Sequence, residues 1–245
     1  MKNTFLLGIL LFVLVIAIPP SGSAAEPKGY HDLLSAGIVR LNQNDLGGAM
    51  QQFKQALAEN PQGVEAFYYI GVTQARAGQI DEAEKNFKEA LARDATFLPA
   101  HFDLGVLYYQ KDQDEAALKE FDTVQRADPD RARVYYYQGL ILRRMGKSKE
   151  AAAKMEKAAS LDPDLALEAN YHAGSAYYEA GELEAARKSF QNVVTLLPEG
   201  ETAQSASDYL ERIDAQARHK RPWDLTFSAG VQYDSNVILE PTRTI

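Results

Sequence analysis

The chain has 245 residues, of which 46% are hydrophobic and 24% are charged, and this composition and length fit one elongated globular domain with flanking segments. Its formal net charge at pH 7 is −8, which makes nucleic acid and anionic membrane surfaces poor partners. The absence of cysteine excludes disulfides, thiolate metal sites and a lipid anchor on an N-terminal cysteine.

Residues 1–25 have the pattern of a secretory signal peptide. Lys2 supplies the positive start, residues 5–18 form an apolar run, and two prolines and several small residues follow. We expect cleavage after Ala25. An uncleaved membrane anchor is the alternative, although the run is shorter than the ~20 residues that span a bilayer. In either case the rest of the chain crosses the inner membrane, which in a bacterium places it in the periplasm.

From residue 30 onward the sequence repeats at intervals of 34 residues. A marker glycine recurs at Gly37, Gly71, Gly105, Gly139 and, one residue late, Gly174. An alanine column recurs at Ala49, Ala83, Ala117, Ala151 and Ala186, and each alanine is followed four residues later by a large apolar residue, at Phe53, Phe87, Phe121, Met155 and Phe190. A fixed period of this length predicts a solenoid of stacked units.

Each copy contains two segments of helical length. Helices are expected at residues 30–43, 46–59, 64–77, 80–93, 98–111, 114–127, 132–145, 148–161, 167–180 and 183–196. Gly105 and Ala117 are small residues inside the two helices of copy three, and glycine costs roughly 1 kcal/mol there relative to alanine, so they predict a close approach of two backbones. Phe121 is expected to fill the space beside it. Left-handed turns are expected between the helices at Gly78, Gly146 and Gly181.

The pattern resembles the tetratricopeptide repeat (TPR) family. In copy three its fixed places are filled by Leu104, Gly105, Tyr108, Ala117, Phe121, Val124 and Pro129. The resemblance covers residues 30–199 and implies an all-α, right-handed solenoid of five helix pairs, at 30–63, 64–97, 98–131, 132–166 and 167–200. Met155 in place of phenylalanine and a one-residue insertion at 165–168 depart from the pattern. Residues 201–219, with apolar residues at helical spacing, are expected to form a capping helix.

In this family the first helix of each pair lines a concave groove. We place the groove at the fifth, ninth, twelfth and thirteenth positions of each repeat, which share one helical face. The candidate partner-binding residues there are Tyr68, Phe102, Tyr109, Tyr136, Tyr171, Tyr178, Arg76, Arg143 and Arg144. Our hypothesis is that this aromatic ladder anchors a protein or peptide. The alternative is that the rings pack between neighbouring first helices.

The sequence holds no constellation typical of an enzyme. The four histidines lie in separate units without metal-ligand spacing, and Glu168 with His172 is interpreted as a solvated pair on one helix. Neither a glycine-rich phosphate loop nor a nucleophile elbow is present. We therefore expect no catalysis, no metal and no cofactor.

Beyond residue 222 the periodicity changes to two. Apolar and polar residues alternate over 223–233, which predicts a strand with one apolar face. This segment resembles the opening strand of outer-membrane barrels that follow periplasmic TPR units, as in exopolysaccharide-export porins and surface-lipoprotein assembly modifiers. Because one strand cannot close a barrel, residues 223–245 are expected to begin one in a longer protein, or to be a remnant. A short strand that folds back on the capping helix or joins a partner's sheet is the alternative.

Two functions remain open from the sequence. The first is an exported TPR scaffold that holds a protein partner in its groove. The second is the periplasmic arm of an outer-membrane export or assembly barrel, of which these residues are the N-terminal portion.

Overall fold

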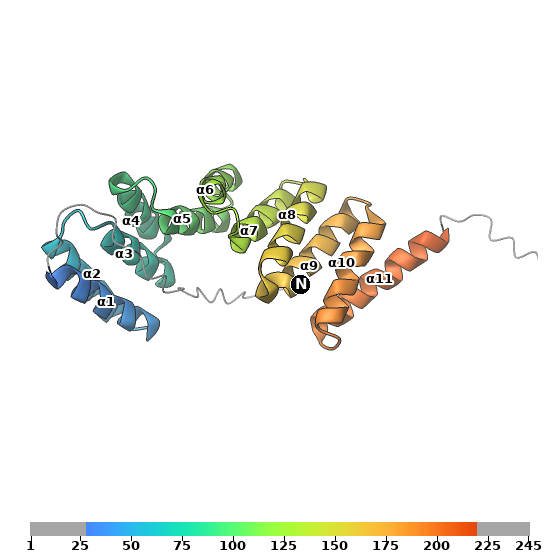
Figure 1. Cartoon of the computed structure of the whole chain (residues 1–245), viewed down its shortest axis with the longest axis horizontal. Helices are drawn as coiled ribbons and strands as arrows, with labels where there is room; N and C mark the ends of the chain where they lie inside the picture. The colour runs from blue at the N-terminus through green and yellow to red at the C-terminus, as the bar shows by residue number, and fades with distance from the viewer. Residues whose placement is uncertain (1–27, 220–245) are drawn as a thin grey trace, which may run out of the picture. The chain divides into compact units, whose positions relative to one another are not determined.

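The computed structural model describes residues 28–219, and over this range the chain is helical. The expected signal peptide (1–25) and strand-like tail (223–245) lie outside the described residues. Eleven α-helices follow one another with short connections (Figure 1): α1 (Lys28–Asn42), α2 (Leu46–Glu59), α3 (Val64–Arg76), α4 (Ile80–Arg93), α5 (Leu98–Gln110), α6 (Asp114–Ala127), α7 (Ala132–Arg144), α8 (Ser148–Leu161), α9 (Pro163–Glu179), α10 (Leu183–Leu196) and α11 (Glu201–His219). None of these eleven is both long enough and apolar enough to span a membrane.

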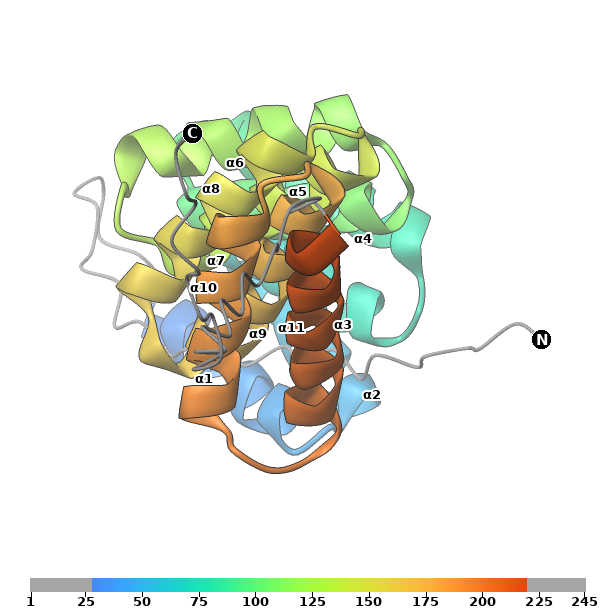
Figure 2. The ribbon, with the colours of Figure 1, turned by 90° about the vertical axis from the view of Figure 1, so that its right-hand side faces the viewer.

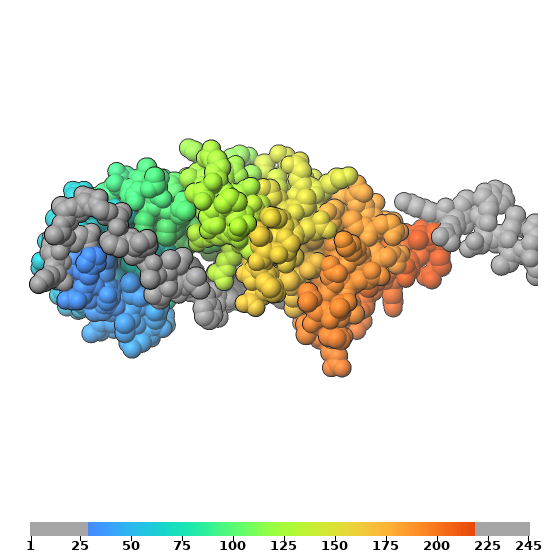
Figure 3. Space-filling view, viewed as in Figure 1, coloured from blue at the N-terminus to red at the C-terminus, as the bar shows by residue number. Residues whose placement is uncertain are grey.

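The chain divides into two compact units, residues 1–100 and residues 101–245. The described part of unit 1 holds the pairs α1–α2 and α3–α4, which are the first two repeats. Unit 2 holds most of α5 and all of α6–α11, which are the last three repeats and the final helix. Within unit 2, α6–α11 contact helices one or two places away in the chain, so the pairs form successive layers in chain order (Figure 3).

The turn inside each pair is closed by a residue in the left-handed region. Its φ is 61° at Asn44, 76° at Gly78, 56° at Asp112, 77° at Gly146 and 76° at Gly181. The residue that follows donates its N–H to a carbonyl of the preceding turn, as from Gln79 to Gln74 at 2.9 Å, which is the Schellman arrangement. The left-handed turns predicted at three glycines are therefore confirmed, and Asn44 and Asp112 adopt the same conformation.

Each pair packs around its marker glycine. A Cβ placed on Gly71 would lie 2.7 Å from the ring of Phe87 and 3.2 Å from the carbonyl oxygen of Ala83. The corresponding closest distances are 2.4 Å from Gly37 to Phe53, 2.9 Å from Gly105 to Phe121, 2.6 Å from Gly139 to Met155 and 2.9 Å from Gly174 to Phe190. These large side chains are at most 1% exposed, so they form the centre of each pair.

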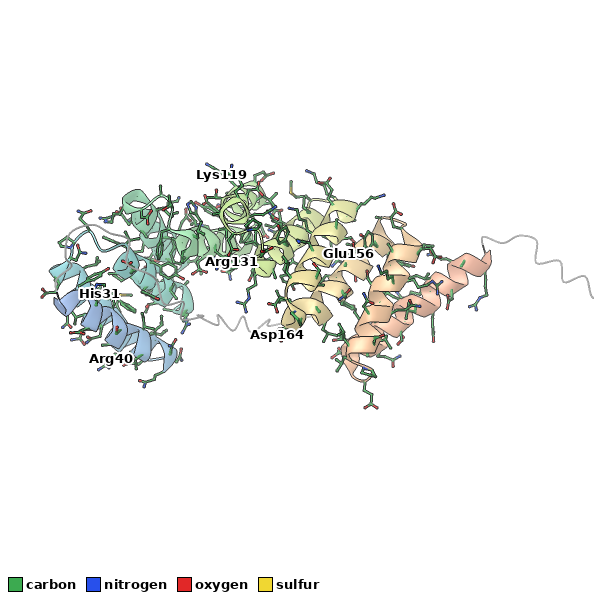
Figure 4. The ribbon with its side chains drawn as sticks, viewed as in Figure 1. His31, Arg40, Lys119, Arg131, Glu156 and Asp164 are labelled. Atoms are coloured by element: carbon green, nitrogen blue, oxygen red, sulfur yellow. The ribbon has the colours of Figure 1, made fainter. Side chains whose placement is uncertain are left out.

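Helix α9 begins earlier than the sequence predicts. The expected start is residue 167, whereas α9 begins at Pro163, because proline suits a first helical position that needs no N–H donor. Asp162 ends α8, and its side chain accepts the N–H of Asp164 at 2.9 Å at the N-terminal end of α9 (Figure 4). The earlier start gives α9 17 residues, compared with 13 in α3, α5 and α7.

Helix α11 packs beside α10 in the way that a first helix packs on the preceding pair (Figure 2). The ring of Tyr209 stacks on Phe190 with centroids 4.5 Å apart, as Tyr69 stacks on Phe53 at 5.3 Å and Tyr137 on Phe121 at 5.4 Å. Two residues after Tyr69 and Tyr137 stand marker glycines, but two residues after Tyr209 stands Glu211, which is exposed. A charged side chain therefore stands in α11 where the pairs have their crossing glycine, and burying it under another helix would be costly.

Candidate partner-binding face

The residues predicted to line the groove lie on the first helices of the repeats, on α3 in unit 1 and on α5, α7 and α9 in unit 2. Within each unit we call the side that carries the fifth, ninth, twelfth and thirteenth residues of each repeat the first-helix face. In unit 1 it holds Tyr68 and Arg76. In unit 2 it holds Phe102, Tyr109, Tyr136, Arg143, Arg144, Tyr171 and Tyr178.

In unit 1 both predicted residues contact their own unit. The half-buried ring of Tyr68 lies 5.9 Å from Phe87 and 5.3 Å from Phe97, measured between centroids. Arg76 donates from Nη1 to the carbonyl oxygen of Leu41 at 2.9 Å, in the last turn of α1. A cation at the C-terminal end of a helix satisfies its free carbonyls and complements the helix dipole. Arg76 therefore fastens the first repeat to the second.

Two of the rings predicted for unit 2 are largely buried. Phe102 is 7% exposed and Tyr136 is 9% exposed. Phe102 packs 5.9 Å from Tyr137 on α7, and Tyr136 packs 5.9 Å from His172 on α9. These two rings pack between neighbouring first helices, and they leave little surface for a partner.

The other three predicted rings of unit 2 are half-buried and belong to a continuous row. The row runs from α5 to α11, with successive centroids 5.7, 5.9, 5.9, 5.8, 6.5 and 5.3 Å apart. We call it the ring series, and its members in order are Tyr109, Tyr137, Tyr136, His172, Tyr171, Tyr209 and Tyr178. Edge-to-face contacts of this kind hold the exposed rings rigidly in place.

Three members of the ring series were not among the predicted residues. Tyr137 and His172 occupy the sixth position of their repeats, and Tyr209 lies on the helix that was expected only to cap the array. A signal for this position is present in the sequence, because Tyr69 and Tyr137 are separated by two repeat lengths. The groove positions of the family do not include it.

Arg143 is engaged by a carboxylate of the next repeat. Its Nε and Nη2 donate to Oε1 of Glu179 at 3.0 and 2.6 Å, and Ser148 donates to the other oxygen of the same carboxylate at 3.3 Å. This hydrogen bonding raises the pKa of the guanidinium above its ordinary value. Arg143 therefore joins α7 to α9 and has little capacity left for a partner's carboxylate.

Arg144 is engaged by the preceding repeat. It donates to the carboxylates of Asp112 and Asp114 and, at 3.1 Å, to the carbonyl oxygen of Tyr109. Its guanidinium carbon also lies 4.5 Å from the centre of the Tyr109 ring. The hydrogen bond with Asp114 raises the pKa of Arg144. Arg76 and Arg144 thus have the same role, two repeats apart.

His172 is not the solvated partner of Glu168 that the sequence suggests. Its side chain is 23% exposed, its Nε2 lies 4.0 Å from Oε1 of Glu168, and its buried Nδ1 has no hydrogen-bond partner. Burial lowers the pKa of His172. The same carboxylate accepts the hydroxyl of Tyr136 at 2.7 Å, and burial together with this bond raises the pKa of that tyrosine.

Among residues 28–219 no group of three or more acidic or histidine side chains is arranged to hold a metal ion. What the first-helix face of unit 2 offers is a row of fixed rings, with two arginines that are neutralised from within the protein. Such a surface can bind another molecule by contact.

Four family models match the chain, and each describes a tetratricopeptide repeat. They match residues 34–96, 74–141, 132–165 and 168–199, so together they extend over almost the whole helical array. No curated protein matches the chain significantly.

Several solved structures are similar to the chain. A crystal structure of MamA protein has a TM-score of 0.61 and 25% identity, and the match covers 69% of this chain and 91% of MamA. YrrB, described as a TPR protein with an unusual peptide-binding site, has a TM-score of 0.63 and 18% identity over 75% of this chain and 100% of its own. PilF of Pseudomonas aeruginosa has a TM-score of 0.64 and 18% identity over 80% and 94%.

Proposed function

Because the chain belongs to the tetratricopeptide repeat family, we propose that it is a non-catalytic scaffold that holds a protein or peptide on the first-helix face of unit 2. The observation that carries the proposal is the ring series, which leaves the rings of Tyr109, Tyr171 and Tyr178 partly exposed and fixed by their neighbours. The peptide-binding site in the description of YrrB supports the same use of this fold.

Rigid tyrosines suit this role for an energetic reason. A tyrosine has few rotatable bonds, so little conformational entropy is lost when a partner covers it, and it offers both an apolar ring and a hydroxyl. In the ring series much of that entropy is already lost in folding. Tyr178, for example, packs 5.3 Å from Tyr209, and its hydroxyl accepts from Gln216 at 3.0 Å. Preorganisation of this kind favours binding.

The ion pairs that the arginines form within the protein indicate which contacts a partner could use. Since Arg143 and Arg144 are held by Glu179, Asp112 and Asp114, a partner's acidic groups would have to compete with carboxylates already in place. We infer that the partner is recognised through the rings rather than through acidic residues.

The test is capture of the partner by two matched variants. Tyr171→Ala with Tyr178→Ala removes the exposed rings of α9, whereas Tyr177→Ala removes a neighbouring tyrosine that faces α8 through its bond to Glu156 at 2.7 Å. The wild type is first crosslinked to proteins in an extract of its own cells, which identifies a captured partner. We expect the double variant to lose this partner and the single variant to keep it. Equal capture by a folded double variant would exclude the ring series as the binding surface.

We propose further that the scaffold is exported and acts in the periplasm. The proposal is supported by the signal-peptide pattern of residues 1–25. Fractionation of cells that express the full chain tests it. Recovery of a shortened chain with the periplasmic proteins is expected, and recovery of the intact chain in the cytosol would contradict export.

The second candidate function is the periplasmic arm of an outer-membrane export or assembly barrel. It is favoured by the alternation of apolar and polar residues over 223–233. Reading the DNA beyond Ile245 tests it: an in-frame series of further alternating segments supports the barrel, and a stop codon removes it.

A further inference from the structure

The joint between the fourth and fifth repeats differs from the other joints of unit 2. At the joints on either side of it, a tyrosine of the following helix stacks on a buried phenylalanine, Tyr137 on Phe121 and Tyr209 on Phe190, with interplanar angles of 10° and 8°. The same two places at this joint are taken by His172 and Met155. A stacked pair of rings cannot form from these residues, and this joint is packed instead through other buried side chains of α7, α8 and α9, among them Tyr136, Ala158 and Ala169.

Carboxylates also bridge this joint. Four glutamates accept hydrogen bonds across it: Glu168 from Tyr136 at 2.7 Å, Glu179 from Arg143 at 2.6 Å, Glu182 from Lys149 at 2.5 Å, and Glu156 from Tyr177 at 2.7 Å. Glu156 stands on α8 (Figure 4). The other three lie on α9 or just beyond its end. A charged acceptor makes bonds of this kind stronger than hydrogen bonds between neutral groups.

His172 lies inside this joint without a full set of partners. From α7 it faces Tyr136, 5.9 Å away between ring centres, and the charge of Arg143, and on its own helix it faces Glu168 and Tyr171. The buried Nδ1 has no acceptor or donor within reach. From α8, Lys149 and Glu156 bond across the same joint.

We propose that the joint between the fourth and fifth repeats is acid-labile, so that below about pH 6 it opens before the other joints of unit 2 and disrupts the ring series that crosses it. The idea that this opening releases a partner rests on the proposed function. The opening of the joint does not depend on the proposed function.

The direction of the effect follows from protonation of the imidazole. A protonated His172 carries an N–H at Nδ1 in a buried place that offers no acceptor, and its charge is repelled by Arg143, with only Glu168 at 4.0 Å to offset this. Because burial lowers the pKa of His172 in the closed joint, the open joint binds the proton more tightly. The closed state therefore loses stability as pH falls below about 6.5, the ordinary value for histidine.

Opening of a single joint is measurable by hydrogen exchange of the full chain, without any partner. At pH 7.5 and pH 5.0, and after correction for the intrinsic pH dependence of exchange, we expect protection in residues 163–179 to fall about tenfold more than in residues 114–127. An equal fall in the two segments would overturn the proposal.

The paired variant Met155→Phe with His172→Tyr supplies the ring stack that the other joints have. We expect it to abolish the extra loss of protection at pH 5.0, whereas His31→Gln, which removes a histidine of unit 1, leaves that loss unchanged. An extra loss that persists in the folded paired variant would refute the role of His172.

Histidine ring signals in the NMR spectrum of the wild type give a second measurement that needs no variant. The proposal requires the His172 imidazole of the closed joint to take up its proton only at a pH below the ordinary value for histidine, and titration at that ordinary value without any opening would overturn it. Once a partner is captured, its release at pH 5.0 from the wild type but not from the paired variant links the joint to binding. If the joint opens at low pH but no partner is found, the result counts against the proposed function and still supports the acid-labile joint.

Discussion

The marker glycines show how much packing depends on single atoms in this fold. At each crossing the second helix brings a large side chain against the place where a Cβ would stand. For Gly71 this includes a backbone oxygen, which cannot move aside as a side chain can. The repeat therefore keeps a residue that is poor in helices because the crossing cannot form with a larger one.

Gly71→Ala is expected to destabilise unit 1 by about 1 to 3 kcal/mol, because its methyl group would overlap the ring of Phe87. Gly47→Ala is the matched control. It also adds a methyl group to a helix of unit 1, but there the nearest atom is Oδ1 of Asp45 at 4.0 Å. The free energy of unfolding is therefore expected to rise by up to about 1 kcal/mol. Urea unfolding followed by circular dichroism measures both, and a neutral Gly71→Ala would show that the crossing is looser than described.

Left-handed turn residues act at the same scale through the backbone alone. Gly146 has φ of 77°, and no atom lies within 4 Å of the place that a methyl group would occupy, so only backbone strain opposes a side chain there. We expect Gly146→Ala to cost about 1 to 2 kcal/mol. Asn44→Gly, at the same turn of the first repeat, is expected to stabilise slightly. Thermal unfolding of the two variants checks that the first lowers the melting temperature and the second raises it.

Helices in this protein are fastened to their neighbours by different means at different joints. Arg76 and Arg144 bond to carbonyls in the last turn of the preceding first helix, whereas α11 is fastened through Tyr209, which stacks on Phe190 and meets Tyr171 and Tyr178 at its edges. The final helix is thus part of the candidate binding face as well as a cover.

Tyr209→Ala is expected to destabilise unit 2 by about 2 to 4 kcal/mol, because it removes the stack on Phe190 and the support of two exposed rings. Asp208→Ala, one residue earlier and exposed, is expected to change stability by less than about 0.5 kcal/mol. Hydrogen exchange of α10 in the two variants measures the difference. Equal protection would mean that α11 does not stabilise the fifth repeat.

On the scale of the whole molecule, negative charge is in excess, but the charged side chains of the candidate face are bonded to groups of the protein itself. The chain carries a net charge of −8, yet the arginines predicted to meet a partner are bonded to the protein's own carboxylates and carbonyls. Partner binding is therefore expected to change less than about threefold between 0.05 and 0.5 M salt. Titration of the captured partner at both concentrations checks this, and a steep salt dependence would show that charge recognition dominates.

Much of the fold was predictable because the period of the sequence fixes where helices begin and end. The columns of glycine, alanine and large apolar residues place most helix ends within one or two residues. The exception is α9, which the pattern places from residue 167 although the helix begins at Pro163. The candidate site was harder to predict from the sequence. The repeat pattern places residues on one face of a helix, but it does not show which of them are buried by neighbouring helices. Phe102 and Tyr136 share that face with Tyr178, and only the contacts distinguish them.

Glu211 in α11 decides at which end the molecule can be lengthened. An engineer who appends another helical hairpin after residue 219 would force its backbone against a carboxylate where the other pairs have a bare Cα. Insertion between α10 and α11 places the new hairpin after the repeat of Gly174 and keeps Glu211 in the last helix. Arrays lengthened by internal duplication are therefore expected to assemble, whereas arrays lengthened after residue 219 are not.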